Sequence, residues 1–113
     1  MDRLTHYRTL IEEILQRHAV LMNSQPVPGE AVDCVFDEQR DHYVLLKYGW
    51  PRGKHADYTK LHVRVVDHKI WIEEDMTEDG FAIELVAAGV PKDDIALAFI
   101  PPELRHIEDY AVA

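Results

Sequence analysis

The chain has 113 residues, 47% of them hydrophobic, and a formal net charge of −9. A chain of this length typically forms one domain, here 1–113, that buries about two thirds of its unfolded surface. The single cysteine excludes an internal disulfide framework and no apolar run reaches the ~20 residues of a membrane span, so we expect a cytoplasmic protein with no membrane partner.

Apolar residues recur at spacings of three and four from Leu4 to Met22 and predict an amphipathic helix over residues 3–22. Its polar face mixes acidic and basic side chains, which favours packing on a sheet over binding to a membrane surface. His18 falls on the apolar side, where we expect a core or boundary histidine rather than a ligand. Residues 23–30 contain two prolines and a glycine and should form a loop.

Two strands are predicted next, over 31–36 and 42–50, joined by the turn DEQRD. The second strand is apolar on both faces, and this pattern predicts a central strand that is covered on both sides. Cys34 lies in the first strand, with no basic or histidine neighbour in sequence that would lower its pKa. We therefore expect a buried, unreactive thiol.

The segment 51–60 is polar and basic and should form a loop, and residues 61–66 should form the third strand. A short turn at Asp67 and His68 leads into a fourth strand that begins at Lys69. Because the turn is so short, it predicts an antiparallel hairpin.

In the fourth strand, Ile70 and Ile72 alternate with Trp71, which is the period of a half-buried strand. A second helix follows, with Leu85 on its apolar face. We expect Trp71 and Leu85 to be core contacts between the hairpin and this helix.

The boundaries of the second helix are marked by local chemistry. Asp75 and Thr77 can accept hydrogen bonds from the free N–H groups that open a helix, and Glu78 and Asp79 place negative charge at its positive end. Gly89 can adopt the left-handed conformation that ends a helix.

After the second helix, alternating apolar residues over 95–99 predict a fifth strand, and Pro102 to His106 should form a single helical turn. The predicted fold class is therefore α+β, with an N-terminal helix and a second helix packed on a mostly antiparallel sheet of about five strands, in the order α-β-β-β-β-α-β.

Two stretches also carry a family resemblance. Residues 69–99, KIWIEEDMTEDGFAIELVAAGVPKDDIALAF, with the later PPELRHIEDYAVA, and residues 37–50, DEQRDHYVLLKYGW, resemble the XisI-like proteins, the fdxN element excision controlling factors. The resemblance covers essentially the whole chain. It implies a role in programmed DNA excision by a site-specific recombinase, with an XisH-like protein as the usual companion, and it brings no catalytic residues.

Charge is spread unevenly along the chain. Residues 47–69 contain six Lys and Arg side chains against two Asp, about +4, whereas residues 73–94 contain eight acids against one lysine, about −7. These segments could be two ordinary solvated surfaces, or one or both could meet a charged partner.

A metal site is one alternative at the turn between the first two strands. Asp37, Asp41 and His42 could bind a divalent ion, but their spacing matches no known ligand frame, and Arg40 offers a salt-bridged turn instead. We therefore expect no metal and no cofactor. The sequence also contains no P-loop, GxSxG elbow or paired CxxC, so we expect no enzymatic activity.

An acidic chain is poorly suited to binding DNA through its phosphates. The sequence therefore favours an accessory factor that binds a protein, either an XisH-like protein or a recombinase, with Glu74 and Asp79 as candidate contacts. The alternative is direct DNA binding by a directionality factor through Arg52, Lys54 and Lys60. Homo-oligomers also remain open.

Overall fold

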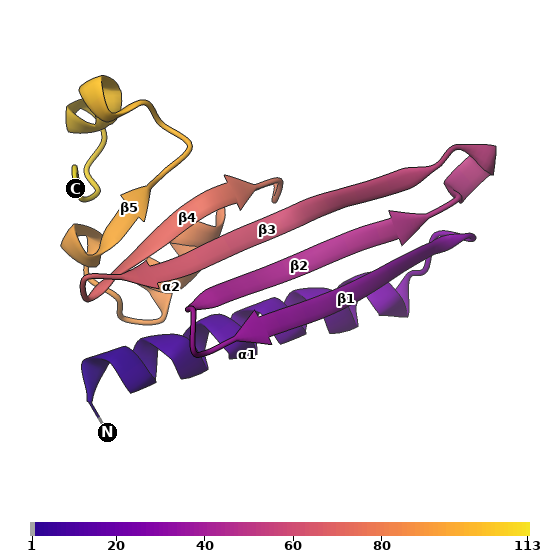
Figure 1. The fold of residues 1–113 in the computed structure, drawn as a ribbon, viewed down its shortest axis with the longest axis horizontal. Coiled ribbons are helices and arrows are strands. Elements are labelled where there is room, and N and C mark those ends of the chain that lie inside the picture. The colour runs from indigo at the N-terminus through magenta and orange to yellow at the C-terminus, as the bar shows by residue number, and fades with distance from the viewer. Residues whose placement is uncertain (1) are drawn as a thin grey trace.

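The computed structural model describes residues 2–113 as a single twisted sheet with helices packed against it (Figure 1). The elements are α1 (Arg3–Ser24), β1 (Glu30–Asp37), β2 (His42–Gly49), β3 (Ala56–Val66), β4 (Lys69–Asp75), α2 (Phe81–Ala87) and β5 (Ile95–Leu97), with 3-10 turns at Pro51–Gly53, Lys92–Asp94 and Pro102–Ile107. The strand order is β1-β2-β3-β4-β5; the first four strands are antiparallel, and β5 is parallel to β4. The predicted fold class and element order are confirmed.

The N-terminal helix α1 packs along the sheet through one stripe of side chains. Asp2 caps the helix, because its Oδ1 accepts a hydrogen bond from the backbone N–H of Thr5 at 2.7 Å. The fully buried stripe is spaced by three and four residues, as the sequence predicts: Tyr7, Ile11, Ile14 and Leu15. His18 is the expected boundary histidine, and its Nε2 lies 2.6 Å from the carboxylate of Glu84 on α2.

Both helices lie on the same face of the sheet (Figure 1), so the core occupies one layer between helices and strands. The strand side chains that fill this layer are fully buried: Tyr43, Leu45, Leu61, Val63, Ile70 and Ile72. On the opposite face of β2, Val44 and Leu46 are only half-buried. The prediction that β2 is covered on both sides is therefore wrong, because no second layer of helices is present over residues 2–113.

β3 is longer than the sequence indicates. Residues 56–60, predicted as loop, are strand, because Tyr58 pairs with Lys47 and Thr59 pairs with Leu46 across an irregular register. The β2–β3 hairpin therefore extends past the end of β4 as an arm, defined here as residues 47–60 (Figure 1).

Gly29 and Gly49 allow the loop before β1 to lie close to the end of β2, beside this arm. The N–H of Trp50 donates to the carbonyl of Gly29 at 2.8 Å. Gly49 has φ +131°, and a Cβ there would come within 2.1 Å of the Gly29 oxygen. A side chain at Gly49 is therefore incompatible with this close approach.

The second helix begins later than the sequence predicts. The Asp75 carboxylate reaches forward and accepts a hydrogen bond from the N–H of Phe81 at 2.6 Å, so its predicted role is confirmed. Thr77 does not cap the helix, since its hydroxyl donates to Asp75 instead. Glu78 and Asp79 precede the first turn.

The end of α2 agrees with the sequence. Gly89 has φ +103°, and the N–H of Val90 donates to the Leu85 carbonyl at 3.0 Å. This is the Schellman arrangement, which requires a left-handed residue at that position.

The expectation for Trp71 is wrong. Leu85 is fully buried with Ile70 and Ile72, whereas Trp71 points to the opposite face of β4 and contacts the C-terminal segment. There the Arg105 guanidinium lies 5.4 Å from the centre of a Trp71 ring. The alternation of the strand dictates this result, because neighbouring residues cannot share a face.

Candidate interaction surfaces

The end of the arm carries the predicted basic residues. Arg52 and Lys54 are exposed, while Lys60 is half-buried further along β3. Trp50 is 64% exposed beside them, with its ring 5.0 Å from that of His55. In the described part of the chain, none of the three cationic side chains forms an ion pair.

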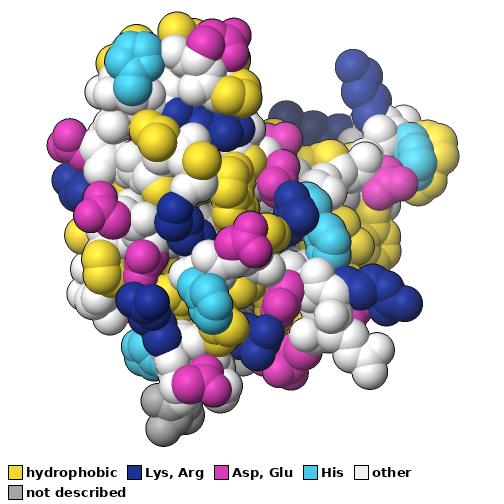
Figure 2. All heavy atoms as spheres, turned by 60° about the vertical axis from the view of Figure 1, so that its left-hand side comes forward, with side chains coloured by type: hydrophobic (Ala, Val, Ile, Leu, Met, Phe, Trp, Pro, Cys, Tyr) yellow, Lys and Arg dark blue, Asp and Glu magenta, His cyan; other side chains and the backbone are white. Residues whose placement is uncertain are grey.

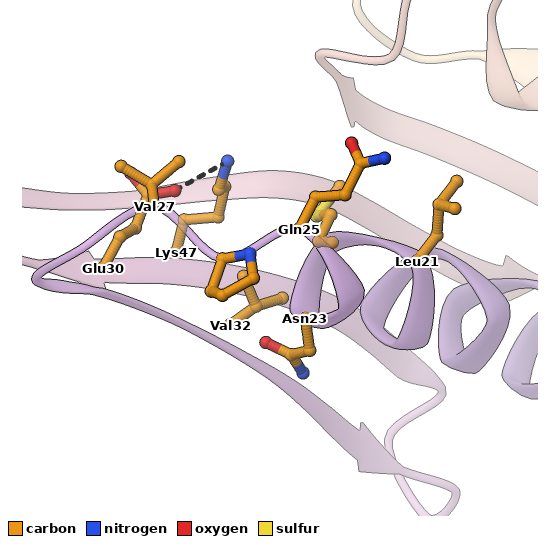
Figure 3. Close-up of a pocket in the computed structure, with 9 residues that line it drawn as sticks. Leu21, Asn23, Gln25, Val27, Glu30, Val32 and Lys47 are labelled. Atoms are coloured by element: carbon orange, nitrogen blue, oxygen red, sulfur yellow. Dashed lines mark ion pairs between the residues drawn. The ribbon is translucent and has the colours of Figure 1, made fainter.

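The other cations of segment 47–69 are engaged within the molecule. Lys47 forms an ion pair with Glu30 at 2.9 Å, and both side chains are largely buried (Figure 3). Arg64 pairs with Glu73 at 3.1 Å, and Lys69 donates to the backbone oxygen of Ala113. The basic segment therefore presents three free cations rather than six.

Internal contacts also engage half of the eight acids in segment 73–94. Glu73 pairs with Arg64, and Asp75 accepts the hydrogen bond from Phe81. Glu84 contacts His18, and Asp94 accepts a hydrogen bond from Tyr7 at 2.5 Å. Burial and the neighbouring Asp94 together raise the pKa of Tyr7 to about 12. These four acids stabilise the fold and are not available as a uniform charged surface.

Glu74 and Asp79 lie on what remains of the acidic segment. Both are exposed and, with the exposed Glu78, form the surface called the acidic loop, residues 74–79. Over residues 2–113 none of these three forms an ion pair. The N–H of Met76 donates to the carbonyl of Lys60 at 3.0 Å, so the acidic loop adjoins the base of the arm.

The molecular surface does not present one large field of either sign in the view of Figure 2. Acidic and basic side chains alternate there, with histidines and apolar side chains between them. A partner that recognises this protein by charge must therefore contact small local clusters of charged side chains, because the net charge alone does not define a binding surface.

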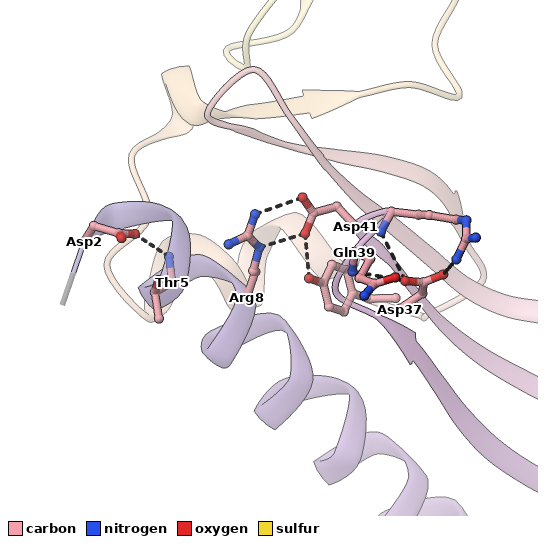
Figure 4. A network of polar contacts seen from close by, with 8 residues as sticks. Asp2, Thr5, Arg8, Asp37, Gln39 and Asp41 are labelled. Carbon is pink, nitrogen blue, oxygen red and sulfur yellow. Dashed lines mark hydrogen bonds and ion pairs between the residues drawn. The ribbon is translucent and has the colours of Figure 1, made fainter.

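The turn between β1 and β2 does not assemble the candidate metal site. Asp37 pairs with Arg40 at 2.8 Å, whereas Asp41 pairs with Arg8 of α1 (Figure 4). The hydrogen bonds from Arg8 hold the pKa of Asp41 below its usual range. His42 contacts His62 instead, and residues 2–113 contain no group of three or more potential metal ligands. The turn is salt-bridged through Asp37 and Arg40, which is the alternative to a metal site that the sequence offered.

Sequence reasoning missed a pair of histidines on the open face of the sheet. Nδ1 of His42 lies 2.9 Å from Nε2 of His62, and the rings are stacked with centroids 5.2 Å apart. Burial, followed by the neighbouring His42, lowers the pKa of His62. Strand register brings them together, since β2 and β3 place these residues in neighbouring pairs, His42 opposite Arg64 and His62 opposite Val44. No local pattern in the sequence indicates this register.

A small hollow of about 240 Å³ lies where the end of α1 meets β1 and β2, and the largely buried Glu30–Lys47 pair lies on its wall (Figure 3). This volume is below the roughly 300–1,000 Å³ of typical ligand sites. We assign it no ligand.

Cys34 is half-buried rather than buried, because β1 is at the edge of the sheet. Its thiol lies 3.6 Å from the carbonyl of Leu15, and burial raises its pKa. No helix in residues 2–113 combines the length and apolarity needed to cross a membrane.

These features define a small α+β protein whose sheet is covered by helices on one face and in which several charged side chains, including half of the cations of segment 47–69, are engaged internally. The chain belongs to the XisI family, described as XisI protein, which it matches over residues 1–112. None of the curated proteins with which it was compared matches it.

Two crystal structures of proteins from Anabaena variabilis ATCC 29413 have the same fold. A XisI-like protein is 32% identical, with a TM-score of 0.87, and the match covers 97% of this chain and 99% of that one. The fdxN element excision controlling factor XisI is 39% identical, with a TM-score of 0.86, and the match covers 99% of this chain and 100% of that one.

Proposed function

We propose that this protein controls the site-specific excision of a DNA element by binding a protein partner, and that it acts without enzymatic activity of its own. Its similarity to a protein described as an fdxN element excision controlling factor supports the role in excision. The internal contacts of Lys47, Arg64 and Lys69 support the protein-binding mode.

The choice of a protein partner over DNA rests on one observation. Half of the Lys and Arg side chains in segment 47–69 are engaged in internal contacts. Lys47, Arg64 and Lys69 are held by neighbouring groups, so three free cations remain on the arm of a chain with net charge −9. Binding to duplex DNA rests on neutralising phosphates with many Lys and Arg side chains. Three cations can provide at most about half of the contacts of a protein that neutralises 6–10 phosphates.

The acidic loop is the surface that suits a basic protein partner. Glu74, Glu78 and Asp79 are exposed and form no ion pair within residues 2–113, so their carboxylates are accessible to a partner. An XisH-like protein or a recombinase with a basic nucleic-acid surface has the complementary charge. Acidic side chains steer such a partner towards the complex within about a 10 Å screening length.

One specific observation favours direct DNA binding as the second candidate. The arm extends past the end of β4 (Figure 1), and at its end the exposed Trp50 lies next to Arg52 and Lys54. Aromatic and cationic groups together suit nucleic acid. In this alternative, Arg52, Lys54 and Lys60 contact phosphates.

A titration of the purified protein with duplex DNA at low and at physiological salt separates the two candidates. We expect weak binding that disappears at physiological salt, together with a stable complex when an XisH-like protein or a recombinase is co-expressed. Micromolar DNA binding that survives physiological salt, and that is lost in the triple variant Arg52→Ala, Lys54→Ala, Lys60→Ala, would establish the alternative.

Charge reversal then tests the surface. Glu74→Lys with Asp79→Lys should slow association with the protein partner, and the effect should shrink at high salt. The matched control is Glu103→Lys with Glu108→Lys, which changes net charge equally on exposed residues of the C-terminal segment. Equal effects of both pairs would show that net charge, and not the acidic loop, determines binding.

A further inference from the structure

The two edges of the sheet end in different ways. β5 is three residues long, and the C-terminal segment closes its outer edge, since Ala111 pairs with Ala96 and its N–H donates to the Ile95 carbonyl at 2.8 Å. A closed edge of this kind prevents pairing with another chain.

The opposite edge strand, β1, has no such closure. It is eight residues long, and its register with β2 is continuous from Glu30 opposite Gly49 to Asp37 opposite His42. Within residues 2–113, β2 is its only partner. Natural edge strands are usually protected by lysine, proline, a bulge or short length. β1 shows none of these features.

The three acidic side chains of β1 already have partners within the same sheet and turn, and they restrict the register of a further strand rather than exclude it. Glu30 pairs with Lys47, and Asp37 pairs with Arg40. Asp33 accepts a hydrogen bond from the Tyr48 hydroxyl.

The side chains of β1 are also incompletely buried. Val32, Cys34 and Phe36 face the core and pack against it, but each is only half-buried at the edge. On the other face, Val35 is 51% exposed. One additional strand paired with β1 would cover these partly exposed apolar side chains on both faces of the sheet.

We propose that β1 is the pairing edge for a second copy of this chain, aligned antiparallel so that the two five-stranded sheets join into one. Directly opposed residues in an antiparallel pair point to the same face of the sheet. In a symmetric pair of β1 strands, one residue must therefore lie opposite the same residue of the second copy, and the two-fold axis passes between them. Centring it on Asp33 would oppose two carboxylates, and centring it on Val35 would place Asp33 opposite Asp37.

Centring the axis on Cys34 avoids both conflicts. Val32 then lies opposite Phe36 of the second copy and extends the core row across the junction. Asp33 lies opposite Val35 of the second copy on the open face, and the two Cys34 residues face each other. This self-complementary pattern is the reason for choosing a second copy over an unrelated strand.

The oligomeric state in solution tests the proposal. We expect purified protein to show twice the mass of the chain by light scattering or sedimentation across the micromolar range. Val35→Asp should convert it to the single-chain mass, because it places a carboxylate opposite Asp33 of the second copy. Ile83→Asp is the matched control, since Ile83 is 58% exposed on α2, and should leave the mass doubled.

A second variant and a cross-link distinguish loss of pairing from loss of folding. Val35→Lys places a cation opposite Asp33 of the second copy and should keep the doubled mass, so single chains in Val35→Asp with unchanged circular dichroism report the register and not a folding defect. In a Cys34→Ser background, Asp33→Cys with Val35→Cys should form intermolecular disulfides under mild oxidation. A single-chain mass for the unaltered protein, or a doubled mass that survives Val35→Asp, overturns the proposal. Loss of a complex with a different protein in Val35→Asp, from an unaltered protein that is a single chain, would assign the edge to that protein's strand instead.

Discussion

Arg8 of α1 and Asp41 of the β1–β2 turn form two parallel hydrogen bonds, with Nε to Oδ1 at 2.7 Å and Nη2 to Oδ2 at 3.0 Å (Figure 4). The Tyr43 hydroxyl donates to the same carboxylate at 2.8 Å, and Asp41 has φ +58°. One carboxylate therefore joins the N-terminal helix to the first hairpin, in a backbone conformation that aspartate tolerates better than most residues.

Asp41→Asn should lower the free energy of unfolding by about 2 kcal/mol at neutral pH, because charge-assisted hydrogen bonds are lost from a partly buried site. The folded-state pKa of Asp41 is lowered, so its contribution is present above the unfolded pKa of about 3.9 and is lost as the pH falls through the folded value. Urea unfolding of both proteins between pH 7 and pH 2 checks this.

The difference in stability between the two proteins should shrink at acid pH. Asp37→Asn is the control, because Asp37 also has a lowered pKa but its ion pair with Arg40 is more exposed and should contribute less. A difference that stays constant down to pH 2 would contradict an ionic role for Asp41.

Local patterns were sufficient for most of the fold. The three- and four-residue spacing of α1, the short turn at Asp67 and His68, and the glycine at the end of α2 each depend on nearby residues, and the structure confirms them. The contacts missed from the sequence are distant ones. Arg8 and Asp41 are 33 positions apart, and nothing in the sequence indicates that this aspartate contacts α1 rather than Arg40.

The candidate surfaces were predicted less well, for the same reason. Charge counts along the chain treat every lysine as free, whereas Lys47 is neutralised by Glu30 on the neighbouring strand. Strand register determines such pairs, and register follows from long-range packing. The three cations and two acids chosen as candidates do remain unpaired in the described chain, but whether they bind a partner stays a prediction.

Leu85→Ala should destabilise the protein by roughly 2–4 kcal/mol, because Leu85 is fully buried between α2 and the sheet. Chemical denaturation gives the value. Ile83→Ala on the exposed side of the same helix should stay within about 0.5 kcal/mol of the unaltered protein, as surface changes usually do. A loss below about 1 kcal/mol at Leu85 would contradict the packing described for α2.

Gly89→Ala should cost about 1 kcal/mol or more, since alanine is strained at φ +103°. No atom lies within 4 Å of the position that its Cβ would occupy, so the cost reports backbone conformation and not a clash. Gly49→Ala provides a contrast, because there the Cβ would meet the Gly29 oxygen and the loss should be larger. Thermal unfolding of both variants compares the two effects, and equal losses would contradict the distinction.

Arg105 is expected to hold the C-terminal segment against the sheet. Its Nε donates to the Ile100 carbonyl at 2.9 Å and its Nη2 to the Ala98 carbonyl at 3.3 Å, while the guanidinium lies over Trp71. Only a planar, forked donor can make these contacts together, so Arg105→Lys should restore little of what Arg105→Ala loses.

The measurable consequence is opening at the β5 edge. The N–H of Ala111 donates to Ile95, and its hydrogen exchange should accelerate about tenfold in Arg105→Ala if opening becomes easier by about 1.4 kcal/mol. The amides of β2 should keep their exchange rates, because the core there does not involve Arg105. Arg40→Ala, which removes an exposed arginine at the distant β1–β2 turn, should leave Ala111 unchanged. Unaltered exchange of Ala111 in Arg105→Ala would show that the tail is held by Tyr110 packing and the Ala96 pairing alone.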